Sequence, residues 1–331
     1  MMEGVPVTVQ EVRRILAGEK PANLAESSQE LVRGYQEAMS FVLRRADDPA
    51  FSWNRELIIG IHDRVLGGNY ALDAGRLRRR PRYLVDQATG REIFAPAAAE
   101  NLEELVDRVC DAMTRSNVHA AAAAAWIHIA VAAIHPFGDG NGRVARILAS
   151  LVMVRAGYKR PQFTSLEEWW GHNLPTYYAA FACLGASFDA KADVTPFIVA
   201  HTSAQLSQIR ALDLRERCEH QIWTALENLL ADLGLAPRLA NALWDAFHGR
   251  DVTAGFYRNL ADISPATATS DLSAATAAGL LRTEGRRRGR RYLPGDRLVP
   301  LLTEALGIAP ELAEEGQRAV VAALGARLLA L

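Results

Sequence analysis

The sequence has little of what disulfide-stabilised, zinc-binding or membrane-spanning proteins require. Its three cysteines, Cys110, Cys183 and Cys218, lie far apart without CxxC spacing, which excludes a disulfide framework and predicts small buried side chains. The most apolar stretch, residues 119–134, is alanine-rich, contains His128 and is shorter than the ~20 apolar residues of a membrane span. The N-terminus lacks a basic segment followed by an apolar block, so we expect a cytoplasmic protein.

An excess of charge of one sign is also missing. Lys and Arg together number 37 and Asp and Glu 38, which gives a net charge of −1. Any site for phosphate or nucleic acid must therefore come from local clustering of basic residues. Half of the residues are apolar and 23% are charged, a balance that excludes extended disorder, and 331 residues predict two domains or one large domain with appendages.

Alternating β-branched residues are scarce, while alanine and leucine dominate, so we predict a mostly helical protein. Apolar residues at helical spacing predict helices over 9–16, 23–45, 53–66, 100–114, 119–134 and 143–156. The clearest strand signal lies at 82–95, where two β-rich runs flank a polar turn that contains Gly90. This pattern predicts a β-hairpin.

One segment, HPFGDGNGRVAR at 135–146, carries the chemistry of the chain. It joins an apolar helix to a second helix, so it is predicted to be a loop that opens into a helix N-terminus. Its glycines allow tight turns with exposed N–H groups, and the helix N-terminus adds free N–H groups and a positive dipole end. The segment therefore predicts a cradle for phosphate.

Side chains around this loop complete the predicted site. Asp139 offers the carboxylate that Mg²⁺ prefers beside phosphate oxygens. Arg143 and Arg146 share one side of the following helix and can hold further phosphate oxygens. His135 stands at the rim, where a neutral imidazole can accept a hydroxyl proton, and Phe137 is predicted to pack in the core.

The segment resembles the HPFx[D/E]GNGRxxR signature of the Fic family, and the likeness extends over roughly residues 2–205. The hairpin at 82–95 sits where that family has its flap, the edge on which a target segment docks. Tyr177 and Tyr178 resemble the family's helix beyond the nucleotide. The resemblance implies an all-α fold, a Fic helical core with a small β-hairpin flap.

The resemblance also implies the reaction. His135 would deprotonate a Ser, Thr or Tyr hydroxyl of a protein, and the oxygen would attack the α-phosphate of ATP. Asp139 would bind Mg²⁺, and pyrophosphate would leave. The nucleotide would be held by Gly138, Gly140, Asn141, Gly142, Arg143, Arg146, Tyr177 and Tyr178. A phosphorylating branch has lysine where Gly142 stands, so the sequence favours transfer of AMP.

The N-terminus resembles an inhibitory helix found in many Fic proteins. Its pattern, [S/T]xxxE[G/N], is matched from Glu3 onward, and the Ser or Thr is missing because the sequence begins too late to contain it. The resemblance implies that Glu3 pairs with Arg146 and blocks the γ-phosphate. The alternative is that Glu3 is only a frayed terminal residue.

The C-terminal part, about 237–296, resembles a winged helix-turn-helix. Thr267 and Thr269 lie near the start of its predicted recognition helix, and Arg287 and Arg288 belong to an arginine-rich wing that also contains Arg282, Arg286, Arg290 and Arg291. These residues are candidates for DNA contact, with protein docking as the equal alternative. A similar basic run at 76–82, before the predicted flap, is read as a solvated or structural segment.

These observations predict three parts: an N-terminal segment over 1–45, a Fic catalytic core over 46–205, and a linker helix with a winged helix-turn-helix domain over 206–331. The expected activity is Mg-ATP-dependent protein adenylylation. Alternatives are a DNA-binding regulator with a nucleotide-sensing Fic core and an enzyme that removes AMP. Expected partners are ATP and a protein with a hydroxyl side chain, and no binding to a membrane is expected. DNA and a second copy of the chain are further candidates.

Overall fold

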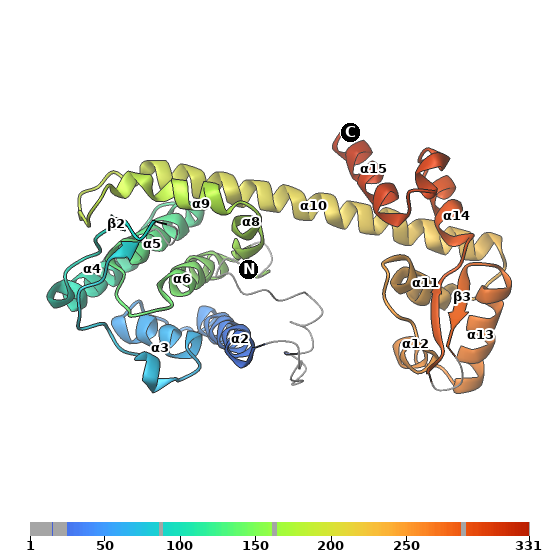
Figure 1. The fold of residues 1–331 in the computed structure, drawn as a ribbon, viewed down its shortest axis with the longest axis horizontal. Helices are drawn as coiled ribbons and strands as arrows, with labels where there is room; N and C mark the ends of the chain where they lie inside the picture. Colours follow the sequence, from blue (N-terminus) through green and yellow to red (C-terminus); the bar gives the residue numbers. More distant parts are fainter. Residues whose placement is uncertain (1–14, 16–24, 86–88, 161–163, 286–288, 331) are drawn as a thin grey trace. The chain divides into compact units, whose positions relative to one another are not determined.

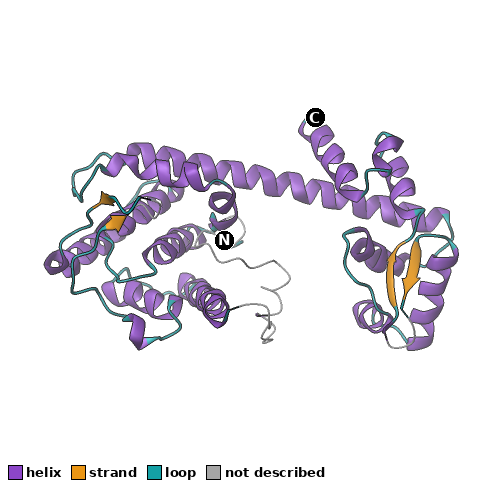
Figure 2. Cartoon of the chain, in the orientation of Figure 1, coloured by secondary structure: helices purple, strands orange, loops and turns teal. Residues whose placement is uncertain are grey.

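The computed structural model describes residues 15, 25–85, 89–160, 164–285 and 289–330. The chain forms two compact units, Met1–Ile209 and Arg210–Leu331, and helix α10 (Thr195–Asp232) supplies residues to both. The predicted all-α class is confirmed, because helices dominate and the sheets of the described residues are two small antiparallel hairpins (Figure 2). The finer domain limits at 45 and 205 stay predictions.

The first unit consists of helices packed against one another, with a short hairpin at their edge (Figure 1). Its described elements are α2 (Glu26–Ala46), α3 (Arg55–Val65), η1 (Tyr70–Leu72), β1 (Leu84–Val85), β2 (Glu92–Phe94), η2 (Ala99–Asn101), α4 (Leu102–Arg115), α5 (Ala120–Ile134), α6 (Asn141–Arg155), α8 (Glu167–His172), α9 (Leu174–Ala180), η3 (Phe181–Leu184) and the first part of α10. The helices predicted from apolar spacing between 23 and 156 are therefore present, with ends shifted by a few residues.

Helix α6 is the centre of this unit. It packs against α2, α3 and α5, and Gly142 and Arg155 are its only residues that are not buried. Helix α5 is apolar on nearly all sides, as expected for a helix that neighbours cover completely. The loop between these two helices, which holds the candidate site, therefore connects two of the most deeply buried segments of the unit.

Helices α2 and α3 approach each other closely at Gly34. A Cβ atom built on Gly34 would lie 2.5 Å from the Val65 carbonyl oxygen and 2.8 Å from that of Arg64. No real side chain tolerates such contacts with main-chain atoms, so only glycine fits this position. The C-terminal end of α3, which borders the candidate site, is thereby held directly against α2.

The hairpin predicted at 82–95 is confirmed. Strands β1 and β2 pair antiparallel with Leu84 opposite Phe94, and the register shifts by a bulge before Val85 pairs with Glu92. Just beyond β2, Ala95 forms a parallel bridge to Ser187, which ties the end of the hairpin to the segment after η3.

The second unit contains the rest of α10, further helices and the second hairpin. Its elements are η4 (Pro237–Leu239), α11 (Ala240–Phe247), α12 (Ala254–Ala261), α13 (Pro265–Ala277), β3 (Leu281–Glu284), β4 (Arg291–Pro294), α14 (Leu298–Ala305), η6 (Pro310–Ala313) and α15 (Gln317–Leu329). Its core is a separate apolar cluster that includes Leu226, Leu243, Tyr257 and Leu272.

Local sequence explains the two successive helices α12 and α13. The Thr253 hydroxyl accepts a hydrogen bond from the Phe256 N–H at 3.2 Å and caps the start of α12, and Asp262 ends that helix in a left-handed conformation. The Ser264 hydroxyl accepts from the Thr267 N–H at 3.1 Å, and Pro265 occupies the first turn of α13. The helix, turn, helix and hairpin expected here are present, and their assignment as a winged helix-turn-helix stays a prediction.

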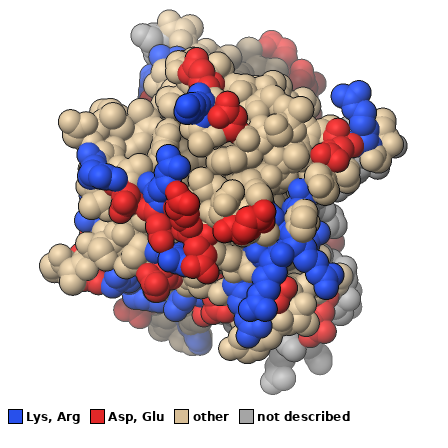
Figure 3. Space-filling view, turned by 90° about the vertical axis from the view of Figure 1, so that its left-hand side faces the viewer, with Lys and Arg blue, Asp and Glu red and all other residues tan. Residues whose placement is uncertain are grey.

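The predicted burial of the cysteines is confirmed for two of them. Cys110 and Cys218 are buried and Cys183 is half-buried, all three with free thiols. Burial raises the pKa of the Cys110 thiol to about 12. Among the described residues, none of the helices combines the length and the apolar content that crossing a bilayer demands. Acidic and basic side chains share the face drawn in Figure 3, in keeping with the net charge of −1.

Candidate active site

The α5–α6 loop begins at an unusual backbone position. His135 ends α5 in the left-handed region, with φ of 53°, which few residues other than glycine adopt. Its N–H still donates to the Val131 carbonyl at 2.9 Å, so the helix continues up to the turn. Gly140, with φ of 75°, directly precedes the first turn of α6. The two left-handed residues reverse the chain within a few positions and place the imidazole beside a helix N-terminus.

Asn141 holds this loop closed from inside. Its side-chain amide donates to the Phe137 carbonyl and accepts from the Phe137 N–H, both at 2.9 Å. Phe137 is fully buried, which agrees with its predicted packing role, and Asn141 is also buried. The Asn141 side chain is thus used within the loop, so any contact of this residue with phosphate is left to its main-chain N–H.

His62 supports the loop from helix α3. Its ring stacks on Phe137 with 3.7 Å between centroids and 9° between planes. The Gly75 N–H donates to His62 Nδ1 at 3.1 Å, so the proton is on Nε2, which donates to the Asp139 carbonyl at 3.2 Å. Burial lowers the pKa of His62 to about 4, consistent with a neutral ring. No sequence pattern singled out His62, because its partners are distant along the chain.

Asp139 lies at the mouth of the loop. Its side chain is 61% exposed, with Oδ1 accepting from the Gly140 N–H at 2.6 Å and Oδ2 accepting from Arg143 Nη2 at 3.2 Å. Arg143 is buried, and its Nε has no hydrogen-bond partner in the described part of the chain. A buried guanidinium with a free N–H, next to an exposed carboxylate, is suited to an anion that arrives from solvent.

The donor set around Asp139 fits Mg²⁺ supplied with a polyphosphate. The described residues contain no cluster of three or more His, Cys, Asp or Glu that could hold a metal ion alone. From the residues that the structure describes, each carboxylate oxygen of Asp139 accepts one hydrogen bond, which leaves further lone pairs, and Mg²⁺ is commonly held by one carboxylate with phosphate and water oxygens. Asp139 would therefore be the protein's ligand, with the remaining positions filled by the nucleotide and water.

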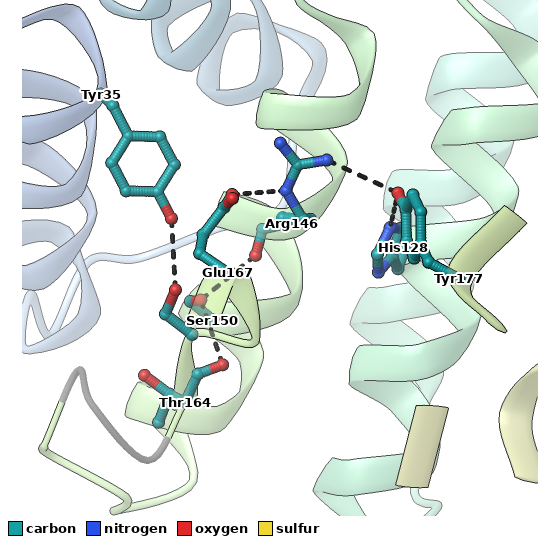
Figure 4. A network of polar contacts seen from close by, with 8 residues as sticks. Tyr35, His128, Arg146, Ser150, Thr164, Glu167 and Tyr177 are labelled. Carbon is teal, nitrogen blue, oxygen red and sulfur yellow. Dashed lines mark hydrogen bonds and ion pairs between the residues drawn. The ribbon is translucent and has the colours of Figure 1, made fainter. Parts of the chain in front are cut away.

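Arg146 belongs to a buried polar network that links α6, α8 and α9 (Figure 4). Its guanidinium is 5% exposed and donates through Nε to a Glu167 carboxylate oxygen. A second nitrogen, Nη1, lies 3.5 Å from the Tyr177 hydroxyl, which in turn lies 3.1 Å from His128 Nε2. Helix α6 therefore presents Arg146 in a fixed position, already paired with an acid from the core.

The neighbourhood of Glu167 is also polar and closed. The Tyr35 hydroxyl lies 3.3 Å from that of Ser165, and burial, followed by the nearby Glu167 charge, raises the pKa of Tyr35 above its ordinary value. Ser150 in α6 donates to the carbonyls of Arg146 and Thr164, at 3.1 and 3.2 Å. Besides the ion pair, the segment that carries Glu167 is thus attached to α6 through Ser150 and Thr164, and to α2 through Ser165 and Tyr35.

His135 is held in its neutral form. Burial, followed by the positive charges of Arg78 and Arg82, lowers the pKa of His135 to about 4. Its Nδ1 lies 3.4 Å from the Ala132 carbonyl, so a proton on Nδ1 leaves Nε2 as the basic nitrogen. At neutral pH the imidazole can therefore accept a proton without first losing one.

The remaining predicted site residues lie in different environments. Tyr177 is buried against Trp170 and Phe181 and reaches the site only through its hydroxyl, whereas Tyr178 is 63% exposed. Glu3, Arg287 and Arg288 lie outside the described residues.

The two threonines of α13 use their hydroxyls locally. Thr267 Oγ1 lies 2.8 Å from the Ser264 hydroxyl, and Thr269 donates to the Pro265 carbonyl at 2.9 Å. No Lys or Arg occurs between Pro265 and Ala277, and the one acidic residue there, Asp271, is buried against Arg238 and Tyr257. The exposed face of α13 is therefore uncharged.

The first unit is thus a mostly helical domain with one small hairpin, in which a glycine-rich loop follows His135 and opens α6. The model of the Fic/DOC family matches residues 52–153, the part of the chain that contains the α5–α6 loop. The chain is 35% identical over 130 residues to "Protein adenylyltransferase Fic" of Nematostella vectensis and 37% identical over 105 residues to "Protein adenylyltransferase fic-1" of Caenorhabditis elegans. These matches cover 38% and 30% of this chain, but only 29% and 19% of the relatives.

Solved structures agree with the fold. A Fic family protein from Desulfovibrio desulfuricans G20 superposes with a TM-score of 0.55 at 18% identity, covering 88% of this chain and 82% of that one. A Fic domain containing signaling protein from Bacteroides thetaiotaomicron VPI-5482 gives 0.57 at 24% identity, covering 64% and 81%. At these identities the likeness concerns the fold alone.

Proposed function

We propose that this chain is a protein adenylyltransferase, which transfers AMP from Mg-ATP to a Ser, Thr or Tyr hydroxyl of a protein. The observation that carries the proposal is the neutral His135, held at the end of α5 and next to the anion loop that opens α6. The names of the Fic relatives support the same reaction, although the matched segment spans less than a third of their length.

The reaction follows from these positions. His135 Nε2 accepts the proton of the target hydroxyl, and the oxygen attacks the α-phosphorus as the bond to the pyrophosphate oxygen breaks. The N–H groups of Gly138, Asn141 and Gly142 and the guanidinium of Arg143 stabilise the phosphate charge, while Gly140, whose N–H donates to Asp139, supplies the turn into α6. Asp139 would hold Mg²⁺, which would supply Lewis-acid neutralisation of that charge when bound. AMP stays on the target, and pyrophosphate leaves.

The identity of residue 142 favours AMP transfer over phosphorylation. Gly142 lies in the first turn of α6 and is one of the two residues of that helix that are not buried. The phosphorylating branch that the Fic resemblance describes has lysine at this position, and glycine offers no such cation. The α-phosphate is therefore the proposed point of attack.

Self-inhibition through Glu3 is part of the proposal. The resemblance pairs Glu3 with Arg146 and excludes the γ-phosphate from that guanidinium. Arg146 is already paired with Glu167, which supports a site where carboxylates and phosphate compete for one arginine. Glu3→Gly should therefore raise auto-adenylylation well above wild type, and Arg146→Ala should abolish it in either background. Equal rates for Glu3→Gly and wild type would contradict the inhibitory role.

For the second unit we propose DNA contact through the wing. Because α13 exposes no Lys or Arg, phosphate contact would depend on the arginines of the β3–β4 hairpin, and the threonines of α13 would contact base edges. A regulator whose Fic core senses nucleotide without turnover is the competing function, and it has no use for a base at His135.

Incubation of the whole chain with α-labelled ATP and Mg²⁺ tests the main proposal. Wild type should label itself or an added protein with AMP, and His135→Ala should reduce the rate by ~10²–10⁴ while ATP binding persists. Asp139→Ala should lose the Mg²⁺ dependence of ATP binding in calorimetry. Transfer by His135→Ala within threefold of wild type would overturn the assignment.

A further inference from the structure

The basic run before the flap contains one arginine unlike its neighbours. Arg76, Arg79, Arg80 and Arg82 are exposed, whereas Arg78 is 7% exposed. A buried guanidinium needs acceptors for its five N–H groups. The hydrogen bonds given to Arg78 by the described part of the chain all end on main-chain carbonyls. The buried guanidinium therefore satisfies main-chain carbonyl groups of the surrounding segments.

Those carbonyls belong to three separate segments. Nε donates to the His135 carbonyl at 2.8 Å, and Nη2 lies 3.4 Å from that of Ile134, at the end of α5. Nη1 donates to the Arg80 carbonyl at 2.9 Å, where the chain enters the flap, and Nη2 donates to the Ala97 carbonyl, where the chain leaves it. One planar group thus connects both ends of the flap to the residue that carries the imidazole.

Two physical effects strengthen this connection. The last carbonyls of α5 lack partners within the helix and lie at its negative dipole end, where a cation is favourable. His135 also has a left-handed backbone, which persists only when the surroundings fix it. The main chain adds a further bond, from the Arg78 N–H to the Pro136 carbonyl at 2.9 Å. Arg78 therefore constrains the backbone on both sides of the His135–Pro136 bond.

We propose that Arg78 is a positioning residue that sets the distance and orientation between the flap and the His135 base. The proposal deepens the proposed adenylyl transfer and rests on it. A target segment docked on the flap presents its hydroxyl at a place fixed by strands β1 and β2, and Arg78 fixes His135 relative to the two ends of that hairpin. ATP would be held by the residues from Gly138 to Arg146, to which Arg78 makes none of its described hydrogen bonds.

This arrangement predicts that a change at Arg78 affects the rate of AMP transfer but not the affinity for ATP. Loss of the guanidinium should slow proton transfer and attack, because misplacement of reacting groups by about 1 Å can cost ~10²-fold in rate. The affinity for ATP should change little. Lysine cannot replace Arg78, because one ammonium group on a flexible stem does not reproduce the planar fork that serves three segments.

The experiment compares Arg78→Lys, Arg78→Met and the matched control Arg79→Met, which removes an exposed neighbour, in the whole 331-residue chain. Calorimetry gives the Kd for Mg-ATP, and single-turnover auto-adenylylation at saturating ATP gives the rate of transfer. Arg78→Lys keeps the positive charge and is the variant expected to stay folded. We expect it to lose ~10–100-fold in rate with Kd within about twofold of wild type, and Arg79→Met to match wild type.

Two results would overturn the proposal. One is an Arg78→Lys variant that transfers AMP at the wild-type rate. The other is a parallel loss of rate and ATP affinity, which would mean that Arg78 supports the whole loop. If wild type and His135→Ala were equally inactive, adenylyl transfer itself would be wrong.

The imidazole resonance of His135 gives a readout that does not depend on activity. Arg78 and Arg82 face this ring from the segment before the flap, and Asp139 faces it from its own loop. Removal of the Arg78 charge in Arg78→Met should raise the titration midpoint of His135, whereas Arg79→Met should leave it in place. An unchanged midpoint in Arg78→Met would contradict the contact between Arg78 and the His135 segment.

Discussion

The buried Arg146 guanidinium is paired with the half-buried Glu167 carboxylate, so the arginine that the Fic resemblance assigns to the γ-phosphate already has a counter-ion from its own chain. Glu167 lies just beyond α6 in the chain, at the start of α8, and its side chain is 22% exposed. A phosphate that reaches Arg146 must therefore share this guanidinium with Glu167 or displace it. The pair predicts a direct link between ATP affinity and the stability of the first unit.

Glu167→Gln should reveal that link. Without the carboxylate, Arg146 loses a buried charge partner, and breaking such a pair can cost ~3–5 kcal/mol. The ligand-free protein should melt at a lower temperature, and Mg-ATP should raise its Tm by more than it raises that of wild type. Thermal melts with and without Mg-ATP measure both effects, and Glu104→Gln, a change at an exposed residue of α4, serves as the control. A nucleotide-induced shift equal to that of wild type would mean that Glu167 and phosphate do not compete.

The rate of AMP transfer should depend little on pH across the neutral range. Because burial lowers the pKa of His135 to about 4, the imidazole stays neutral above about pH 5 and can act as a base there. At subsaturating ATP, the rate should fall only as the pH approaches 4, where protonation removes the base. A midpoint near 6.5 would instead indicate a solvated histidine.

Asn141→Ala should destabilise the first unit and weaken ATP binding. The change leaves the buried N–H and carbonyl of Phe137 without partners, at about 1–3 kcal/mol for each group. Asn141→Asp keeps an acceptor for the N–H but places a carboxylate against the carbonyl, so it should also be destabilised. Urea unfolding measures the loss, with Asn259→Ala, at an exposed position, expected to be near neutral.

DNA binding by the second unit should decrease steeply with salt if the wing contacts phosphates. Replacing Arg287 and Arg288 with alanine should reduce the slope of the logarithm of the binding constant against the logarithm of the salt concentration. The reduction should be about one unit for each phosphate that these arginines no longer neutralise. Thr267→Ala and Thr269→Ala should leave the slope unchanged and relax sequence preference. Arg318→Ala, at an exposed arginine of α15, is the charge-matched control. Absence of any DNA complex at low salt would favour protein docking by this unit.

The sequence was sufficient to predict the loop at 135–146, because its residues are contiguous. Closely spaced glycines predict a turn, and the apolar pattern after them predicts the start of a helix, and both signals depend only on neighbouring residues. The residues that support the loop could not be predicted in this way. His62 meets Asp139 across 77 positions, and Arg78 meets His135 across 57. Histidine in an amphipathic helix and arginine in a basic run are ordinary features, and only tertiary packing brings these two residues to the loop. Glu167 could not be predicted either, because it is one of two adjacent glutamates at the start of α8, and only the fold decides which of the two side chains points inward.

Gly34 shows how far the requirements of this site extend. Because Gly34 has no side chain, the Val65 carbonyl can lie close to its Cα. The same carbonyl accepts a hydrogen bond from Arg143 Nη1 at 3.4 Å. A methyl group at position 34 would push the end of α3 toward the guanidinium proposed to hold phosphate. Random mutagenesis scored for loss of nucleotide binding should therefore recover substitutions at Gly34, a position with no functional group and no place in the signature, together with those in the loop itself.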